Sequence, residues 1–209
     1  MDRSTSISKL LLPVAYLPPV HYFGMMMKAG EVWVEQHETY PKQTYRNRCE
    51  IYTANGKLPL SIPVNKIHGN HTRTRDVLLS DHENWQALHW RAIRSAYANS
   101  PFFLYYHDSL EPFFNKPYHR LLDFNLALMQ VLMDLLGIGK KIHLTRSFDP
   151  APENMLDLRE ALHPKKTFHH FTFRPYHQTF GEKHGFIQGL SMIDLLFNAG
   201  PDSIHIISD

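Results

Sequence analysis

The sequence predicts a mixed α/β fold in which helices flank a single sheet with a central β-hairpin. Short apolar runs bounded by prolines alternate with segments of helical periodicity along the chain. The pair Asn55-Gly56 joins two strand-like segments, Arg48–Tyr52 and Leu58–Val64, which is typical of a tight hairpin turn. No repeat, low-complexity linker or shift in composition divides the chain, so we expect one domain over residues 1–209.

Before the hairpin, short strands surround one helix. Leu10–Tyr16 is apolar and predicts a buried strand, and the alternation of Glu31–Glu35 predicts a second strand. Between them, apolar residues at helical spacing follow Pro19, which is acceptable in a first turn, so we expect a helix over Val20–Met27. After the hairpin, residues 65–76 are polar and predict an exposed loop.

The second half predicts more helix than strand. Ser80 with Glu83 matches a capping box at the start of a helix that Pro101 ends. Leu121–Leu136, which Gly137 follows, has the clearest helical pattern. The other expected elements are brief strands at Val77–Leu79 and Ile142–Leu144, a short helix at Met155–Leu162, a helix at Phe186–Asn198 and a last strand at Ser203–Ile207.

The composition limits the partners and the compartment. The net charge is +2 and no basic stripe occurs, which argues against nucleic acid. The apolar stretch Leu10–Val20 is too short and too rich in proline to span a membrane or to form a signal peptide. Cys49 is the single cysteine, which excludes an internal disulfide, and within a strand it is more often structural than catalytic. We expect a cytoplasmic protein without a membrane span.

The 15 histidines match no established metal-ligand spacing, so we expect no metal ion. The stretch 163–184 is rich in histidine but cannot be assigned from its spacing. No dinucleotide or Walker loop occurs, and the cofactor is unknown from the sequence.

Two short segments are candidates for a functional site. His21 opens a predicted helix, where it could contact a phosphate together with free backbone N–H groups. The alternative is a proline-shaped turn with aromatic packing. Arg46 and Arg48 lie on either side of Asn47 and would share a face if the segment is extended, so they could grip a phosphate or carboxylate. The alternative is a solvated strand edge that charge protects from pairing.

The tail carries one further pair of polar residues. Leu190, Ile193 and Leu196 share one stripe of the expected last helix. Ser191 and Asp194 lie off that stripe. They are expected to face water or, alternatively, to form a lip of the site.

Blocks of the sequence, in order, resemble the WbqC-like proteins. The matching blocks are Tyr16–Phe23, then Lys42 with Tyr45–Arg48, Asn55-Gly56 and Leu60–Val64, then Tyr97–Phe103 and Leu121–Asn125, and finally Tyr176–Gln178, Phe186 and Leu190–Pro201. The sequence departs from many members at Glu35-Gln36-His37, where an aspartate pair is more usual.

The resemblance implies a role in the biosynthesis of bacterial surface polysaccharide, because members are encoded with O-antigen genes. The small-molecule substrate would then be an activated, nucleotide-linked sugar and the reaction a transfer. On this hypothesis His21 and Glu35 are catalytic. The expected substrate-binding residues are Tyr22, Lys42, Tyr45, Arg46, Asn47 and Arg48. The alternative is a non-catalytic module that binds a glycan or a biosynthetic partner. A deep cleft between residues 16–23 and 42–48 would favour the enzyme, and a flat aromatic face would favour the module.

Overall fold

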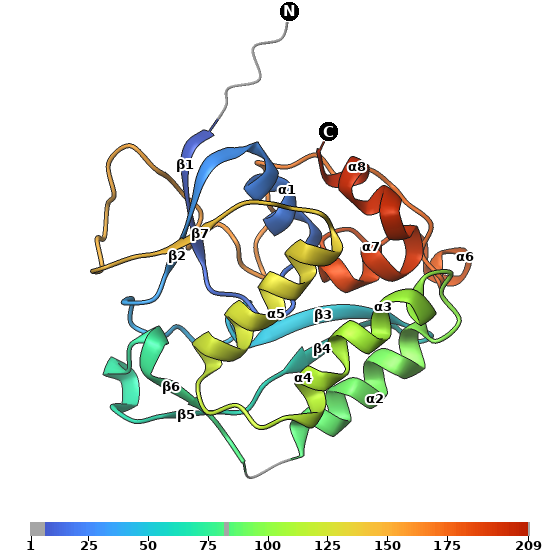
Figure 1. Cartoon of the computed structure of the whole chain (residues 1–209), viewed down its shortest axis with the longest axis horizontal. Helices are drawn as coiled ribbons and strands as arrows, with labels where there is room; N and C mark the ends of the chain where they lie inside the picture. The colour runs from blue at the N-terminus through green and yellow to red at the C-terminus, as the bar shows by residue number, and fades with distance from the viewer. Residues whose placement is uncertain (1–6, 82–83, 209) are drawn as a thin grey trace, which may run out of the picture.

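A computed structural model describes residues 7–81 and 84–208 of the chain. Helices flank a central four-stranded parallel sheet (Figure 1), which confirms the predicted mixed α/β class. Among the residues described, no helix has both the length and the apolar character that crossing a membrane requires.

The central sheet has the strand order β7-β2-β1-β8. Its strands are β1 (Ile7–Pro13), β2 (Ala29–Glu35), β7 (Ile142–Leu144) and β8 (Leu156–Asp157), all paired in parallel. Parallel neighbours need a crossover, and helix α1 (Val20–Lys28) supplies it between β1 and β2. The carboxyl ends of all four strands therefore lie at one edge of the sheet.

Helix α1 packs against the central sheet. Leu10, Leu12, Val32 and Val34 are at most 1% exposed, as expected for strands beneath helices. Helix α1 packs against β1 and β2 and also against α7 (Met192–Ala199) and α8 (Ser203–Ser208). The predicted helix over residues 121–136 is confirmed as α5 (Leu121–Leu135).

The hairpin forms a separate sheet, which corrects the expectation of a single one. Strands β3 (Arg48–Thr53) and β4 (Gly56–Ser61) pair only with each other, and β5 (Val64–Lys66) pairs with β6 (Val77–Leu79) in a third sheet. The hairpin buries Cys49 and Ile51 and packs on α2 (Trp85–Tyr97) and α7 instead of the central sheet. The turn residues are Ala54 and Asn55, one position earlier than predicted, because Gly56 takes the positive φ of 93° and pairs with Thr53.

Three further expectations are wrong in the last third. Residues 155–162 are not helical, because Leu156 pairs with Leu10 in the sheet. The helix of the tail begins only at Met192, since Gly189 has a φ of 75°. Ser203–Ile207 is not a strand but helix α8, and it buries Ser203 and Ile207, one turn apart.

The expected loop and the start of the helix after it also differ from the structure. Residues 65–76 include the 3-10 turns η1 (Gly69–His71) and η2 (Thr74–Asp76), and Thr72 and Thr74 are buried. Asn84 precedes α2 without a side-chain capping bond, and Glu83 lies outside the described residues. The remaining helices are α3 (Phe103–Leu110), α4 (Pro112–Asn115), α6 (Gly181–His184) and the 3-10 turn η3 (Gly200–Asp202).

Candidate functional site

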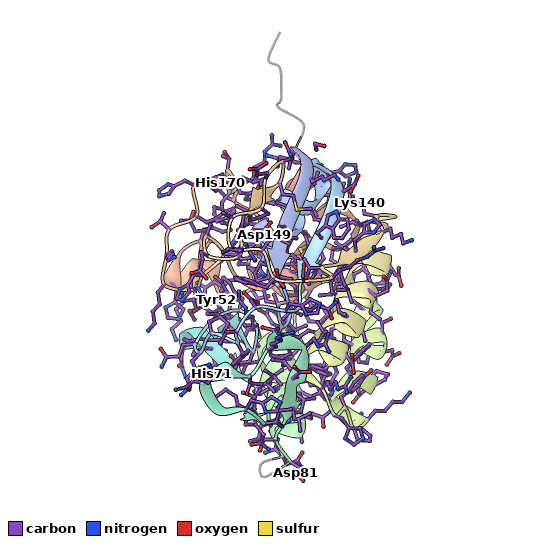
Figure 2. The ribbon with its side chains drawn as sticks, turned by 90° about the vertical axis from the view of Figure 1, so that its left-hand side faces the viewer. Tyr52, His71, Asp81, Lys140, Asp149 and His170 are labelled. Carbon is purple, nitrogen blue, oxygen red and sulfur yellow. The ribbon has the colours of Figure 1, made fainter. Side chains whose placement is uncertain are left out.

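A cavity of about 360 Å³ lies between the first turn of α1, the β3–β4 hairpin and an irregular segment of residues 164–173, which we name the strap. His21 comes from α1, and Glu50 and Lys57 come from the hairpin. Figure 2 labels His170 of the strap and Tyr52 of the hairpin on the same side of the molecule.

His21 lies on the cavity wall because two backbone contacts fix the start of α1. Pro19 bridges to Ser191, and the Val20 N–H donates to the Leu190 carbonyl at 2.9 Å. These contacts tie the helix to the loop before α7. Gly189 of that loop also lines the cavity, and its φ of 75° favours glycine there.

Aromatic rings surround the His21 imidazole. The Phe168 ring lies 4.7 Å from it and the Phe173 ring 5.4 Å, both from the strap, and the Tyr45 ring meets it edge-on at 6.2 Å. His21 is only 4% exposed, and burial lowers its pKa to about 3. The imidazole is therefore neutral at pH 7, and its Nδ1 has no hydrogen-bond partner among the residues described.

Tyr45 contributes a protonated hydroxyl group to the same cavity. Burial is the main cause that raises its pKa, and the nearby Glu50 raises it further. Its phenol therefore stays neutral at pH 7 and can donate a hydrogen bond.

Lysine side chains line two walls of the cavity. Lys57 Nζ donates to Glu50 Oε2 at 2.9 Å, and Glu50 is buried. On the strap, Lys165 Nζ donates to Gln43 Oε1 at 3.1 Å, and Lys166 Nζ donates to the Glu160 carbonyl at 2.8 Å. This arrangement favours an anionic ligand.

The structure brings His21 and Tyr45 together at one cavity, but it does not bring the arginine pair there. Residues 44–47 form a turn and not an extended segment, so the two guanidinium groups diverge. Arg46 is 1% exposed and donates to both carboxylate oxygens of Glu38, at 2.6 and 2.7 Å. Arg48 lies 3.9 Å from Glu50. The expected arginine clamp is therefore absent from the cavity wall.

The other predicted binding residues also lie outside that wall. Asn47 Nδ2 donates to the Ile62 carbonyl at 2.8 Å, and Lys42 is exposed near Lys66. Tyr22 is fully buried, and its hydroxyl donates to the Pro13 carbonyl at 2.9 Å. These contacts give Tyr22 and Asn47 structural roles.

Glu35 lies at the carboxyl end of β2 in a separate buried ion pair. Its carboxylate accepts hydrogen bonds from the His37 N–H, the Thr145 hydroxyl and Arg159 Nη1, at 2.6, 3.0 and 3.1 Å. Arg159 also contacts Asp157 at 2.6 Å. Glu35 is 0% exposed and is not part of the cavity wall, which argues for a structural role.

Sequence reasoning missed Glu50, Lys57 and the two strap lysines. The hairpin contained a signal, because positions 48, 50 and 52 share one face of a strand. No periodicity marks the strap, since it is neither helix nor strand.

Asp194 corrects the expectation that the polar pair of the tail faces water. It is 0% exposed, and its carboxylate accepts hydrogen bonds from the hydroxyls of Tyr97 and Tyr176 and from Gln178 Nε2. Ser191 is buried too and donates to the Leu17 carbonyl at 2.8 Å. Neither residue lines the cavity.

Two other groups have side chains of the types that act in catalysis or bind metal ions. Cys49 is buried, and burial raises the pKa of its thiol, so the structure favours a structural role. Within the parts of the chain that the structure describes, His107, Asp108 and Glu111 are the group whose ligand atoms lie close enough for a metal ion. They lie outside the cavity wall and outside the histidine-rich stretch 163–184.

Comparisons with known proteins agree with the resemblance of the sequence blocks. The sequence model of the WbqC-like protein family matches residues 14–166 and 160–206. The chain is also 26% identical over 216 residues to "Uncharacterized protein Rv1507c" of Mycobacterium tuberculosis (strain ATCC 25618 / H37Rv), covering 90% of this chain and 92% of that protein. No solved structure matches significantly.

Proposed function

The chain belongs to the WbqC-like protein family, and from that premise we propose that it is an enzyme that transfers a group from an activated sugar in the cavity beside His21. The association of family members with O-antigen genes supports a place in the synthesis of surface-polysaccharide precursors.

The observation that carries this proposal is the position of His21. It lines the cavity, and its buried Nδ1 has no partner among the described residues, so a bound acceptor could pass a proton to it. As the hydroxyl or amine of an acceptor forms its new bond to the transferred carbon, its proton passes to His21 Nδ1. The bond to the leaving phosphate oxygen breaks, and that oxygen keeps the electron pair.

The surrounding side chains support such a step. The Tyr45 hydroxyl can donate to an oxygen that gains negative charge, and the lysines compensate the charge on the leaving group. The rings of Phe168 and Phe173 restrict water near the imidazole.

The test combines a ligand screen with turnover measurements. Thermal unfolding is measured with nucleotide sugars, acyl-CoAs and free glycans, because a ligand of the native state raises its stability. We expect a nucleotide sugar to stabilise the protein and to be consumed when an acceptor is present.

A matched pair of variants then tests His21. We expect His21→Gln to lower turnover by about 10²–10⁴-fold with little loss of binding. His170→Gln, at an exposed position of the strap, serves as the control and should leave turnover unchanged. Full activity of the His21 variant would contradict the proposal, and glycan binding without turnover would favour the non-catalytic module.

A further inference from the structure

The cavity wall carries more positive than negative charge. Lys57, Lys165 and Lys166 line the cavity together with one carboxylate, that of Glu50, which leaves a formal excess of two positive charges. The flanking ionic groups do not change this excess. Arg48 lies 3.9 Å from Glu50, and the carboxylate of Glu160 lies 3.9 Å from Lys166, so one charge of each sign is added.

The three ammonium groups are anchored on two opposing elements. Lys57 extends from β4, and its contact with the buried Glu50 holds it at the cavity. Lys165 and Lys166 extend from the strap, where their backbone N–H groups donate to Nδ1 and to the carbonyl of His163. A ligand between the hairpin and the strap would meet positive charge from both.

A second, independent observation also indicates a ligand. His21 lines the same wall, and its buried Nδ1 has no partner among the described residues. A buried polar atom without a partner costs about 1–3 kcal/mol, which a donor group on a ligand would recover. The cavity therefore suits a negatively charged group together with a hydroxyl or amine donor at His21.

We propose that this cavity binds a phosphoryl ligand with two negative charges, held between Lys57 and the strap lysines, and that His21 Nδ1 beside it meets the hydroxyl or amine group of the acceptor. This inference rests on the proposed function because it uses the same cavity. A volume of about 360 Å³ is near the lower end for ligand pockets, so it suits a sugar phosphate but not a whole nucleotide sugar. A nucleoside moiety would extend outside the cavity.

Calorimetric titration tests the inference with four probes. Glucose 1-phosphate carries two negative charges on one phosphate, UDP-glucose carries two on a diphosphate, inorganic pyrophosphate carries more than two, and glucose carries none. We expect the phosphorylated probes to bind and glucose not to bind. The ratio of the affinities for glucose 1-phosphate and UDP-glucose distinguishes a phosphate monoester from a diphosphate diester.

Charge-neutralising variants locate the contact. We expect Lys57→Met, and the double variant Lys165→Gln with Lys166→Gln, each to weaken phosphoryl binding about tenfold or more and to reduce its dependence on salt. Lys141→Gln, at an exposed position outside the cavity wall, is the control. Unfolding midpoints like that of the wild type show that each variant is folded.

The outcomes separate this inference from the proposed function. Lysine-dependent phosphoryl binding without sugar transfer would support the inference and contradict the function. Sugar transfer at the wild-type rate in both lysine variants would support the function and contradict the inference. Absence of phosphoryl binding, or equal binding by the variants and the wild type, would overturn the inference.

Discussion

The hydroxyl group of Tyr97 on α2 donates a 2.9 Å hydrogen bond to Oδ1 of Asp194 on α7, across 97 positions of the sequence. The Tyr97 hydroxyl oxygen also accepts a hydrogen bond of 3.0 Å from the Tyr52 N–H of β3. Tyr176 and Gln178 complete the network at Oδ2, at 2.7 and 3.0 Å. One buried carboxylate thus links two helices, the hairpin and the segment before α6.

Asp194→Asn is expected to destabilise the protein by about 1–3 kcal/mol, because its amide would present N–H donors where Oδ2 now accepts two bonds. Gln178 cannot reorient easily, because its Nε2 donates to the Ile187 carbonyl and its Oε1 accepts from the Ile187 N–H. Urea unfolding at pH 7 measures the loss. Asp134→Asn, at an exposed position of α5, is the control, and equal stability of the two variants would contradict the prediction.

The pH dependence of stability tests the same carboxylate. Burial raises the pKa of Asp194 from 3.8 to about 6, although its three hydrogen bonds oppose the shift. Between these values the native state binds more protons than the unfolded state. The contribution of Asp194 to the free energy of unfolding therefore falls, by up to about 3 kcal/mol, as the pH rises from 4 to 6. Asp194→Asn should remove this component.

Buried histidines should act in the opposite direction. Burial lowers the pKa of His21 to about 3 and that of His89 to about 4, from 6.5. The unfolded state then binds more protons, so their contribution is lost as the pH falls below 6.5, by at most roughly 1.4 kcal/mol per pH unit for each histidine. Urea unfolding from pH 7 to pH 4 should show a shallower loss for His21→Gln than for His170→Gln. Parallel curves would show that His21 is not buried as a neutral group.

Glu35→Ala is expected to cost about 3–5 kcal/mol, because it leaves the buried guanidinium of Arg159 without one of its partners. The matched control is Glu31→Ala. That residue pairs with Lys9 at 3.7 Å, and its side chain is 46% exposed, so the loss should be about 0–1 kcal/mol. A Glu35 variant that keeps its stability but loses turnover would restore the catalytic role.

Leu196→Ala should destabilise the protein by about 2–5 kcal/mol, the usual range for a fully buried leucine. Leu104→Ala is the control, because that side chain is 74% exposed. Urea unfolding compares the two variants. A near-neutral Leu196 variant would show that α7 does not dock on the core.

Gly24→Ala is expected to displace the strap. A Cβ at position 24 would overlap the Phe171 ring, whereas one at Gly139 would meet no atom within 4 Å. Overpacking typically costs about 1–3 kcal/mol, and we expect pyrophosphate binding to weaken as the strap lysines shift. Thermal unfolding and calorimetry compare Gly24→Ala with Gly139→Ala. Unchanged pyrophosphate affinity would show that the packing of Phe171 against Gly24 does not position the lysines.

Elements with a strong local signal were predictable. Proline, glycine and apolar periodicity located β1, α1, the hairpin and α5 within a few residues. Short segments were not predictable, because tertiary pairing outweighs weak propensity. Leu156 is in a strand since Leu10 lies beside it, and α8 is helical where isolated alternation suggests a strand.

The candidate site was predictable only in part. His21 and Tyr45 were expected and do meet, but Arg46 turns to Glu38 and Glu35 pairs with Arg159. A charged residue in a sequence can bind a ligand or a buried counter-ion, and only its spatial neighbours decide between them.

The sequence by itself determined the family, the α/β class and the helix-opening position of His21, because these follow from local order and spacing. Only the tertiary structure decided which charges reach the cavity. It brings the strap, more than 100 positions away in sequence, against His21 and Lys57. Aromatic rings bury the imidazole and keep it neutral, while the lysines stay at the solvent-accessible wall, where their charge is hydrated.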